Sequence, residues 1–431
     1  MIKTKSEIVS ILKNNYSTRD ISFYLGTLFL PSALPISGIF YLIALLLSIK
    51  DITFNKFDLT LFVCSGWMIF SNIRILFFQK GFFSNELIFN SWIGLFNWIP
   101  LFLLYLVFQS FFHKKNREIF IYILLIGTVP VIASCIAQEW FKLYGPFSTM
   151  NGLITWFQPR FYIDGSLVLT GLFSNPNYAA LWLSTMLPFS LYVFRKRNND
   201  KFLLVFSLLI AYFIFLTESR NGLLSLLISI FFLLKLKILL YIFIIVCLSL
   251  ILIYLLNINA PINLEILMPI NLFNKIINLD FINQNSLGRI EIYTKTLTLI
   301  KNSPILGWGA GAFSFFFITQ HTQKVQHAHN MPLELAFNFG VPLSIMLTGF
   351  VTLIIFRAIK IIFFNREFNK LSNKSWLAAT LIILIFNFSD LPYYDGKISL
   401  LSWILLAGLS CIIKEYDSKY KNQKNLLSKI T

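Results

Sequence analysis

Long apolar runs, separated by short polar stretches, dominate the pattern of this chain. A helix of about 20 apolar residues crosses the hydrocarbon core of a bilayer, and its backbone hydrogen bonds are satisfied internally. The sequence therefore predicts an all-α membrane protein, a polytopic helical bundle with about 12 transmembrane helices. The predicted segments are 21–34, 35–49, 58–78, 89–112, 118–137, 177–194, 202–216, 219–234, 238–257, 332–356, 376–390 and 398–413.

The first two segments form either a hairpin of short helices or one kinked span, because Pro31 and Pro35 interrupt them. With twelve spans and a cytoplasmic N-terminus, cytoplasmic segments hold 25 of the 36 Lys and Arg residues, as the positive-inside rule requires. A single first span would break that rule, so the hairpin is favoured. Residues 1–20 and 414–431 are then a cytoplasmic N-terminus and tail, and 21–413 form one transmembrane domain.

Two loops are long, and both fall on the external side in this topology: 138–176 and 258–331. Long loops in compact proteins commonly carry function. The second loop is expected to contain short helices.

Composition agrees with a membrane location, since 57% of the residues are hydrophobic and only 13% are charged. The net charge of +17 follows mainly from the basic cytoplasmic loops. It therefore predicts contact with membrane lipids and no nucleic-acid partner.

Four arginines fall outside the basic cytoplasmic segments, and three of them are candidate anion ligands: Arg160, Arg220 and Arg289. The fourth, Arg74, lies inside a predicted span and is not a candidate. Arg220 stands where a helix is predicted to begin, so its guanidinium and the helix N-terminal amides could face the same anion. Arg289 opens an amphipathic stretch. The alternative for each arginine is that it snorkels to lipid headgroups.

His327 and His329 lie two positions apart, directly before an apolar run. A metal site would draw on them and on His321, but no Cys or Asp lies near in the sequence, so no metal is expected. Hydrogen bonding without chemistry is one alternative. The other is a general base, because the pKa of an unperturbed histidine lies close to neutral pH.

Two weaker signals concern the backbone. Asn175 precedes Pro176 in a pattern typical of a capped helix start. The glycine-rich stretch 307–313 resembles a phosphate loop, but no buried strand precedes it, so it predicts instead a backbone that approaches a ligand or a helix closely.

Four stretches, taken in order, resemble the O-antigen ligase and O-antigen polymerase superfamily over residues 155–350. They are "RFYIDGSLVLTGLFSNPNYAALWL", "SRNGLLSLLIS", "GRIEIYTKTLTLIKNSPILGWGAGAF" and "HAHNMPLELAFNFGVPLSIMLTGF". The resemblance implies a glycosyltransferase of the bacterial inner membrane whose active site faces the periplasm. Its donor would be an undecaprenyl-diphosphate-linked glycan, and it would need neither a metal nor another cofactor.

The resemblance also implies roles for individual residues. Arg220 and Arg289 would bind the donor diphosphate, and His329 would act on the acceptor hydroxyl. Arg160, Asn330 and His327 are further candidate substrate-binding residues. His327 adds an imidazole that the pattern does not require, so which ring is the base stays open.

Three functions are compatible with these features. A ligase would transfer the glycan to lipid A-core, and a polymerase would transfer it to another lipid-linked glycan. A transporter of a small anion such as inorganic carbon would use the arginines as an anion path, but we find neither the inverted repeats nor the broken helices typical of transporters. The ligase is favoured by the twelve spans and the long loop before the histidines.

Overall fold

The computed structural model describes residues 17–52, 56–78, 85–112, 114–152, 154–157, 161–163, 166–233, 248, 288–321 and 325–427. The predicted span 238–257, apart from residue 248, and the candidate Arg160 lie outside these ranges.

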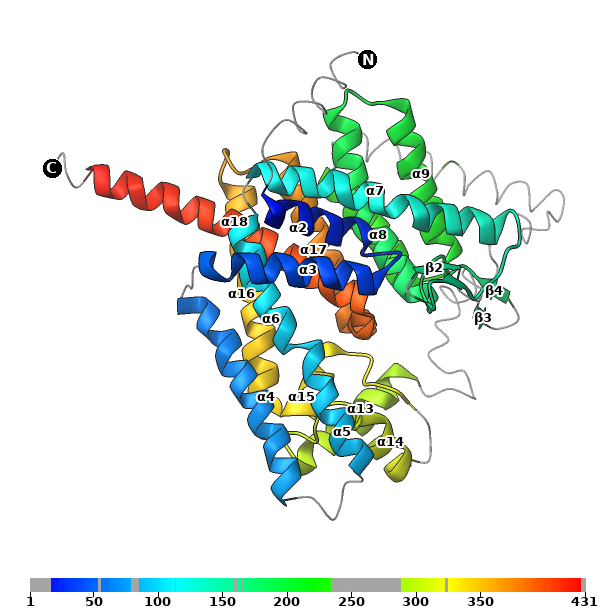
Figure 1. Cartoon of the computed structure of the whole chain (residues 1–431), viewed down its shortest axis with the longest axis vertical. Coiled ribbons are helices and arrows are strands. Elements are labelled where there is room, and N and C mark those ends of the chain that lie inside the picture. The colour runs from blue at the N-terminus through cyan, green and yellow to red at the C-terminus, as the bar shows by residue number, and fades with distance from the viewer. Residues whose placement is uncertain are drawn as a thin grey trace.

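Helices make up most of the described chain, which confirms the all-α class (Figure 1). They are α2 (Thr18–Phe29), α3 (Leu34–Ser48), α4 (Leu59–Phe78), α5 (Asn85–Gly94), α6 (Ile99–Phe111), α7 (Lys114–Glu139), α8 (Pro176–Lys196), α9 (Lys201–Leu216), α10 (Arg220–Leu233), α13 (Arg289–Asn302), α14 (Phe313–His321), α15 (Met331–Phe339), α16 (Val341–Phe364), α17 (Leu371–Ser389) and α18 (Gly396–Leu427). Four single turns of 3-10 helix accompany them: η1 (Ile49–Asp51), η2 (Lys56–Asp58), η3 (Leu95–Asn97) and η5 (Pro392–Tyr394).

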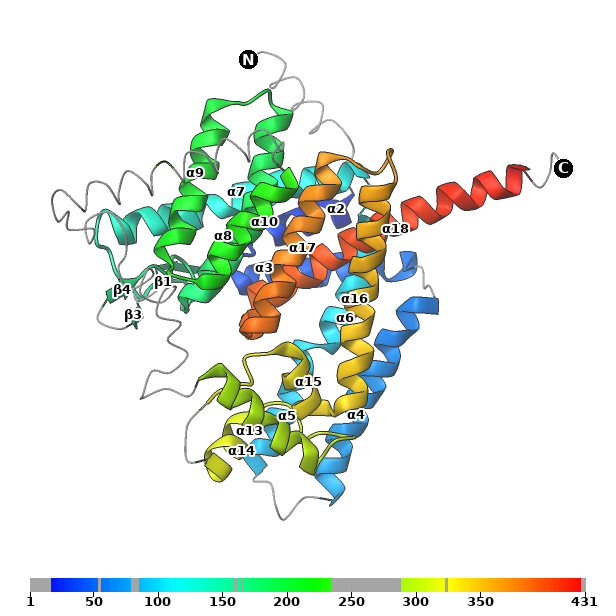
Figure 2. The same cartoon turned by 180° about the vertical axis from the view of Figure 1, so that it is seen from behind.

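The larger part of the molecule is a bundle built around α8 and α17. Helix α8 packs against α9, α10 and α17, and α18 packs against α6, α16 and α17 (Figure 2). The indole of Trp376 on α17 is fully buried at this centre and stacks on Phe120 with ring centroids 5.6 Å apart. Gly408 on α18 makes room for it, since a Cβ there would lie 2.3 Å from the indole. Aromatic packing against a glycine thus fixes the last helices of the bundle.

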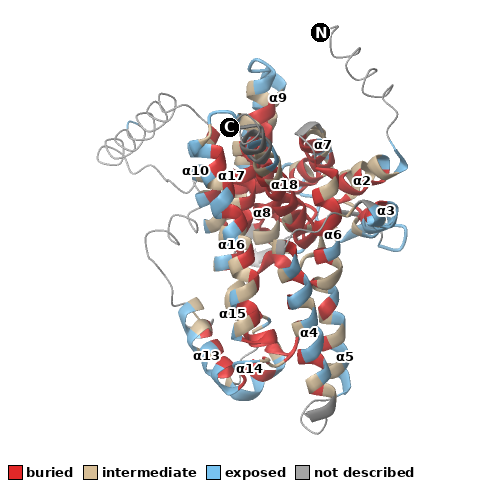
Figure 3. Cartoon of the chain, turned by 90° about the vertical axis from the view of Figure 1, so that its left-hand side faces the viewer, coloured by how far each residue is buried: buried red, intermediate tan, exposed pale blue. Residues whose placement is uncertain are grey.

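A smaller layer lies at one end of the molecule, away from both termini (Figures 1 and 3). It consists of α13, α14 and α15 with the adjoining ends of α4 and α5, and it has its own apolar core. That core includes Ile75, Ile292, Leu299, Phe313, Phe316, Phe317 and Phe337. Helices α13 and α14 are the short helices that the sequence predicts for the loop 258–331.

The loop 138–176 contains two short antiparallel hairpins that the sequence does not predict. One pairs β1 (Phe147–Thr149) with β2 (Ile154–Phe157), and the other pairs β3 (Phe161–Ile163) with β4 (Ser166–Val168). Strands of three or four residues are too short to give a readable alternation of polar and apolar positions.

The predicted count of about twelve spans is not confirmed. Among the described residues, six helical stretches are long and apolar enough to cross a membrane, by length and composition. They are Leu59–Leu76, Asn85–Phe111, Asn116–Glu139, Val341–Phe364, Leu371–Ser389 and Gly396–Tyr420. The first two predicted segments are separate short helices, α2 and α3, as the hairpin requires. Helices α9 and α10 are likewise apolar but shorter than a full span.

Two predicted spans are interrupted. The segment 89–112 bends at η3 before Pro100, and Asn85–Phe111 remains one apolar stretch. The predicted span 332–356 is wrong in its first third, because the chain breaks at Gly340, whose φ is +91°. A Cβ there would lie 1.8 Å from the carbonyl oxygen of Ile305, so only glycine fits this crossing. The break separates α15 from the span α16 and places α15 in the smaller layer.

Candidate functional site

His329 and Asp390 form a side-chain pair between two segments distant in sequence. His329 lies in the loop before α15, and Asp390 directly follows α17. The His329 Nδ1 and Asp390 Oδ1 atoms are 2.8 Å apart. The imidazole side chain is 30% exposed and the carboxylate only 7%. The ring is therefore accessible, while its partner is buried behind it.

Asp390 accepts two further hydrogen bonds. The Asn177 Nδ2 atom donates to Oδ2 at 2.8 Å, and the amide of Leu391 donates to Oδ1 at 2.9 Å. Burial would raise the pKa of Asp390, but the hydrogen bond and charge of His329, together with the charge of Arg289, bring this pKa below its ordinary value. The carboxylate is thus an anion that can only accept, so the proton of a neutral His329 ring stays on Nδ1 and leaves Nε2 as an acceptor.

Asn177 reaches Asp390 because α8 begins where the sequence predicts. The Asn175 side chain caps the helix by accepting from the Asn177 amide at 2.8 Å, and Pro176 occupies the first turn. The cap sets the direction of the first turn, and the Asn177 side chain points from it to Asp390. Local capping in α8 therefore helps to position a carboxylate more than 200 residues away.

The histidine loop has a strained backbone held by several hydrogen bonds. His329 has φ +51°, the left-handed region that favours glycine. Tyr293 of α13 donates to the His329 carbonyl at 3.2 Å. Asn330 caps α15 by accepting from Leu333 N and donates to the Phe388 carbonyl at 2.8 Å. The prediction places Asn330 among possible substrate ligands, whereas here its side chain is engaged in holding the loop against the end of α17.

The second imidazole lies against the first. The rings of His327 and His329 have centroids 4.4 Å apart at 64°. Burial, with the nearby charge of His329, lowers the pKa of His327 to about 4. The Nδ1 atom of His327 is buried and has no hydrogen-bond partner among the described residues. His327 is therefore neutral near pH 7 and lacks the carboxylate that orients His329.

Two predicted arginines lie close to this pair. Arg220 is the first residue of α10 and Arg289 the first residue of α13. The charge of Arg289 acts on both Arg220 and Asp390. Neither guanidinium makes a hydrogen bond or ion pair with any residue that the structure describes. Two like charges that interact, with no direct ion-pair partner among the described residues, favour an anion bound near them.

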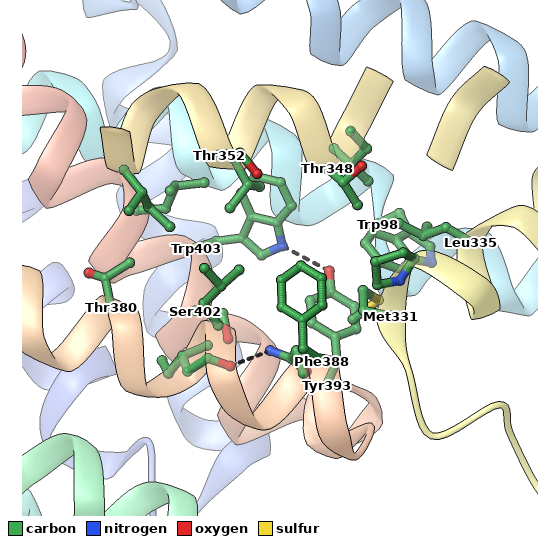
Figure 4. A pocket seen from close by; sticks show the side chains of 18 residues that line it. Trp98, Met331, Leu335, Thr348, Thr352, Thr380, Phe388, Tyr393, Ser402 and Trp403 are labelled. Carbon is green, nitrogen blue, oxygen red and sulfur yellow. Dashed lines mark hydrogen bonds between the residues drawn. The ribbon is translucent and has the colours of Figure 1, made fainter. Parts of the chain in front are cut away.

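An apolar pocket (Figure 4) is lined in part by residues that neighbour His329 and Asp390 in the sequence. Met331 and Pro332, just after His329, and Asn387 and Phe388, just before Asp390, contribute to its lining. The pocket lies among α15, α16, α17 and α18 and has a cavity volume of about 100 Å³. The Trp403 indole donates to the Tyr393 hydroxyl at 2.8 Å on its wall. The site thus combines a polar face with an apolar cavity among the spans.

Residues 205–348 match the family model described as O-antigen ligase. This part of the chain is similar to the O-antigen ligase family. The matched range contains Arg220, Arg289 and His329, and it confirms the resemblance read from the sequence. A search of curated proteins gives no match to the chain.

Two polar residues of the site lie outside the O-antigen ligase match and are absent from the sequence-based candidates: Asn177 and Asp390. The signal for Asp390 was a carboxylate at the end of an apolar run, in "NFSDLPYYDGK". Ionisable residues at such positions are commonly functional. Its histidine partner lies 61 residues earlier, so the pairing itself could not be read from the pattern.

The glycine-rich stretch within the matched range serves packing in this structure. The amides of Trp308 and Gly309 donate to the carbonyls of Phe337 and Asn338 at 2.8 Å, so the stretch lies against the end of α15. This is the close approach to a helix that the sequence allows. Among the described residues, no group of three or more His, Cys, Asp and Glu side chains could hold a metal ion.

Proposed function

We propose that this protein transfers a glycan from an undecaprenyl-diphosphate-linked donor to an acceptor hydroxyl on the periplasmic face of the inner membrane. The family match supports a membrane glycosyltransferase, and lipid A-core is the proposed acceptor. The observation that carries the proposal is the partly exposed His329 ring, oriented by the buried Asp390, with Arg289 and Arg220 nearby and without an ion pair to any described residue.

In the proposed reaction, the neutral Nε2 atom of His329 takes the proton of the acceptor hydroxyl as its oxygen attacks the anomeric carbon of the donor sugar. The bond between that carbon and the diphosphate oxygen breaks, and its electron pair leaves with undecaprenyl diphosphate. General-base assistance of this kind contributes about 10²- to 10⁴-fold in rate. A single displacement inverts the anomeric centre.

Asp390 stabilises the imidazolium that forms when His329 accepts the proton. Its second oxygen stays bonded to Asn177, so the carboxylate keeps its orientation during proton transfer. The pair therefore holds the His329 ring in one orientation and keeps an anion beside the imidazolium that forms, without exposing the carboxylate to substrate.

The two arginines are proposed to stabilise the leaving group. Negative charge accumulates on the diphosphate as the glycosidic bond breaks, and fixed guanidinium groups stabilise that charge most when they are already in place. Arg220 and Arg289 occupy helix starts, which positions both groups on regular backbone. The apolar pocket suits a substrate that carries a lipid chain.

The test uses purified protein in lipid nanodiscs with undecaprenyl-diphosphate-linked glycan and lipid A-core. The proposal predicts glycan on lipid A-core and release of undecaprenyl diphosphate, both undiminished by a chelator. Longer glycans on undecaprenyl diphosphate, formed without lipid A-core, would identify the activity as that of a polymerase and not of a ligase. Absence of any transfer by folded protein would contradict both.

A further inference from the structure

Glu334 is a buried carboxylate that takes no part in the proposed chemistry. It lies in the first turn of α15 and is only 2% exposed. Its Oε2 atom accepts a hydrogen bond from the Ala328 amide at 2.8 Å. Its Oε1 atom accepts from the Tyr394 hydroxyl and from Asn338 Nδ2, both at 3.1 Å. Burying a carboxylate is costly, so these bonds require a structural or functional reason.

The partners of Glu334 belong to the two segments that carry the proposed dyad. Ala328 directly precedes His329 in the histidine loop, and Tyr394 lies in η5, four residues after Asp390. One carboxylate thus bonds to both segments, behind the point where His329 and Asp390 meet. A shift of either segment would change the 2.8 Å contact between Nδ1 and Oδ1.

The hydrogen bonds that Glu334 accepts from Ala328 and Tyr394 are called the brace below. The strained backbone of the histidine loop makes this brace more important. The left-handed conformation of His329 persists only if its surroundings hold it. Tyr293 bonds to the carbonyl of His329, and Asn330 bonds to the carbonyl of Phe388. Glu334 bonds to the amide of Ala328, the residue just before His329. Without an acceptor, the buried Ala328 amide would have no partner, and the loop would gain by turning it towards water.

We propose that Glu334 is a positioning residue: by accepting from both Ala328 and Tyr394, it holds His329 in register with Asp390. This inference rests on the proposed function, because it assigns Glu334 to the alignment of the base. Glu334 touches neither substrate nor reacting atoms. Its removal should therefore slow the transfer step and leave the binding of the donor unchanged.

Two substitutions separate hydrogen-bond acceptance from charge. Glu334→Leu removes every acceptor at similar volume. Glu334→Gln keeps an oxygen for the Ala328 amide. Its new NH₂ group takes the Oε1 position, where it can donate to the Tyr394 hydroxyl oxygen and, once the Asn338 amide rotates, to the Asn338 Oδ1 atom, which is buried without a partner among the described residues. The amide side chain can thus preserve the brace without its charge.

The matched control is Glu118→Leu. Glu118 on α7 is a partly buried carboxylate that accepts from Tyr192 and Lys196, in the bundle and away from the dyad. His329→Ala is measured in parallel, so that a failure of the proposed chemistry is recognised separately from a failure of the brace.

The experiment measures kcat and the KM for the undecaprenyl-diphosphate-linked glycan, with thermal unfolding of each purified variant. We expect kcat of Glu334→Leu to fall at least about 10-fold with KM nearly unchanged, as for loss of an interaction needed only in the transition state. Glu334→Gln should recover most of that loss, and Glu118→Leu should keep the wild-type kcat.

Full kcat in Glu334→Leu, beside an inactive His329→Ala, would overturn the inference and leave the proposed function standing. Equal loss in the Leu and Gln variants would overturn it as well, because charge and not acceptance would then be required. If Glu334→Leu does not fold, the proposal is tested with Tyr394→Phe, which removes one hydrogen bond of the brace. An unchanged kcat in that variant would refute the proposal.

Discussion

Replacing Asp390 by Asn is the change that most sharply separates an oriented base from an ordinary surface histidine. The side chain keeps its volume, and its oxygen in the Oδ1 position can still accept from the Leu391 amide and from Nδ1 of His329. The new NH₂ group takes the Oδ2 position and faces the Asn177 side chain, whose amide oxygen can accept from it once that amide rotates. The substitution therefore leaves the ring oriented and removes the negative charge that stabilises the imidazolium formed in the reaction.

The size of the effect follows from the contact distance. With Nδ1 and Oδ1 2.8 Å apart, the charges of the imidazolium and the carboxylate are centred about 4 Å apart and attract by about 4 kcal/mol at an effective dielectric constant near 20. Because the ring is 30% exposed, water screens part of this attraction. A loss of about 2–4 kcal/mol corresponds to a decrease of roughly 30- to 1,000-fold in kcat.

The assay is glycan transfer by purified Asp390→Asn in nanodiscs, with Asp395→Asn as the matched control. Asp395 lies five residues further along and accepts from the amides of Lys397 and Ile398 at the start of α18, a role that Asn fills about equally well. The control should keep near wild-type turnover. Wild-type turnover in Asp390→Asn would refute the pairing as a catalytic device.

Three further predictions concern the arginines, the second histidine and the topology. Arg220→Ala and Arg289→Ala should each weaken binding of undecaprenyl diphosphate and abolish transfer in protein that still inserts into the membrane. Substitution of either arginine by Lys should restore little activity, because Lys lacks the bidentate guanidinium. Unchanged binding in either alanine variant would mean that the residue contacts lipid headgroups and not the donor. His327→Ala should reduce turnover only mildly, because Asp390 bonds to His329, and burial keeps His327 neutral with a pKa lowered to about 4. That lowered pKa also means that the unfolded chain binds more protons between about pH 6.5 and 4, so thermal stability should fall as pH drops through this window, and less so in His327→Ala. Reporter fusions at residue 280 should be active only in the periplasm and fusions at residue 365 only in the cytoplasm, and the reverse pattern would contradict the topology.

Elements marked by local chemistry could be predicted from the sequence. Helices α8, α10 and α13 begin at Pro176, Arg220 and Arg289, where a cap, an apolar run or an amphipathic pattern indicates a start. Such signals depend on a few neighbouring residues. The family resemblance implied roles for Arg220, Arg289 and His329; in the structure the charge of Arg289 acts on Arg220 and on Asp390, the partner of His329.

Features that depend on tertiary contacts could not be predicted. The break at Gly340 is required by the carbonyl of Ile305, which lies 35 residues earlier in the chain, while the apolar sequence around it reads as one span. Asp390 was missed because a carboxylate after an apolar run has no visible partner until the fold brings His329 to it. Pairs formed across long sequence separations leave no periodic signal in either segment.

The most direct test of the account is the single-turnover rate of His329→Ala with undecaprenyl-diphosphate-linked glycan, measured together with its affinity for undecaprenyl diphosphate. If His329 is the base, this variant loses most of the transfer rate and binds undecaprenyl diphosphate as tightly as the wild-type protein does. Wild-type transfer by His329→Ala would contradict the central claim.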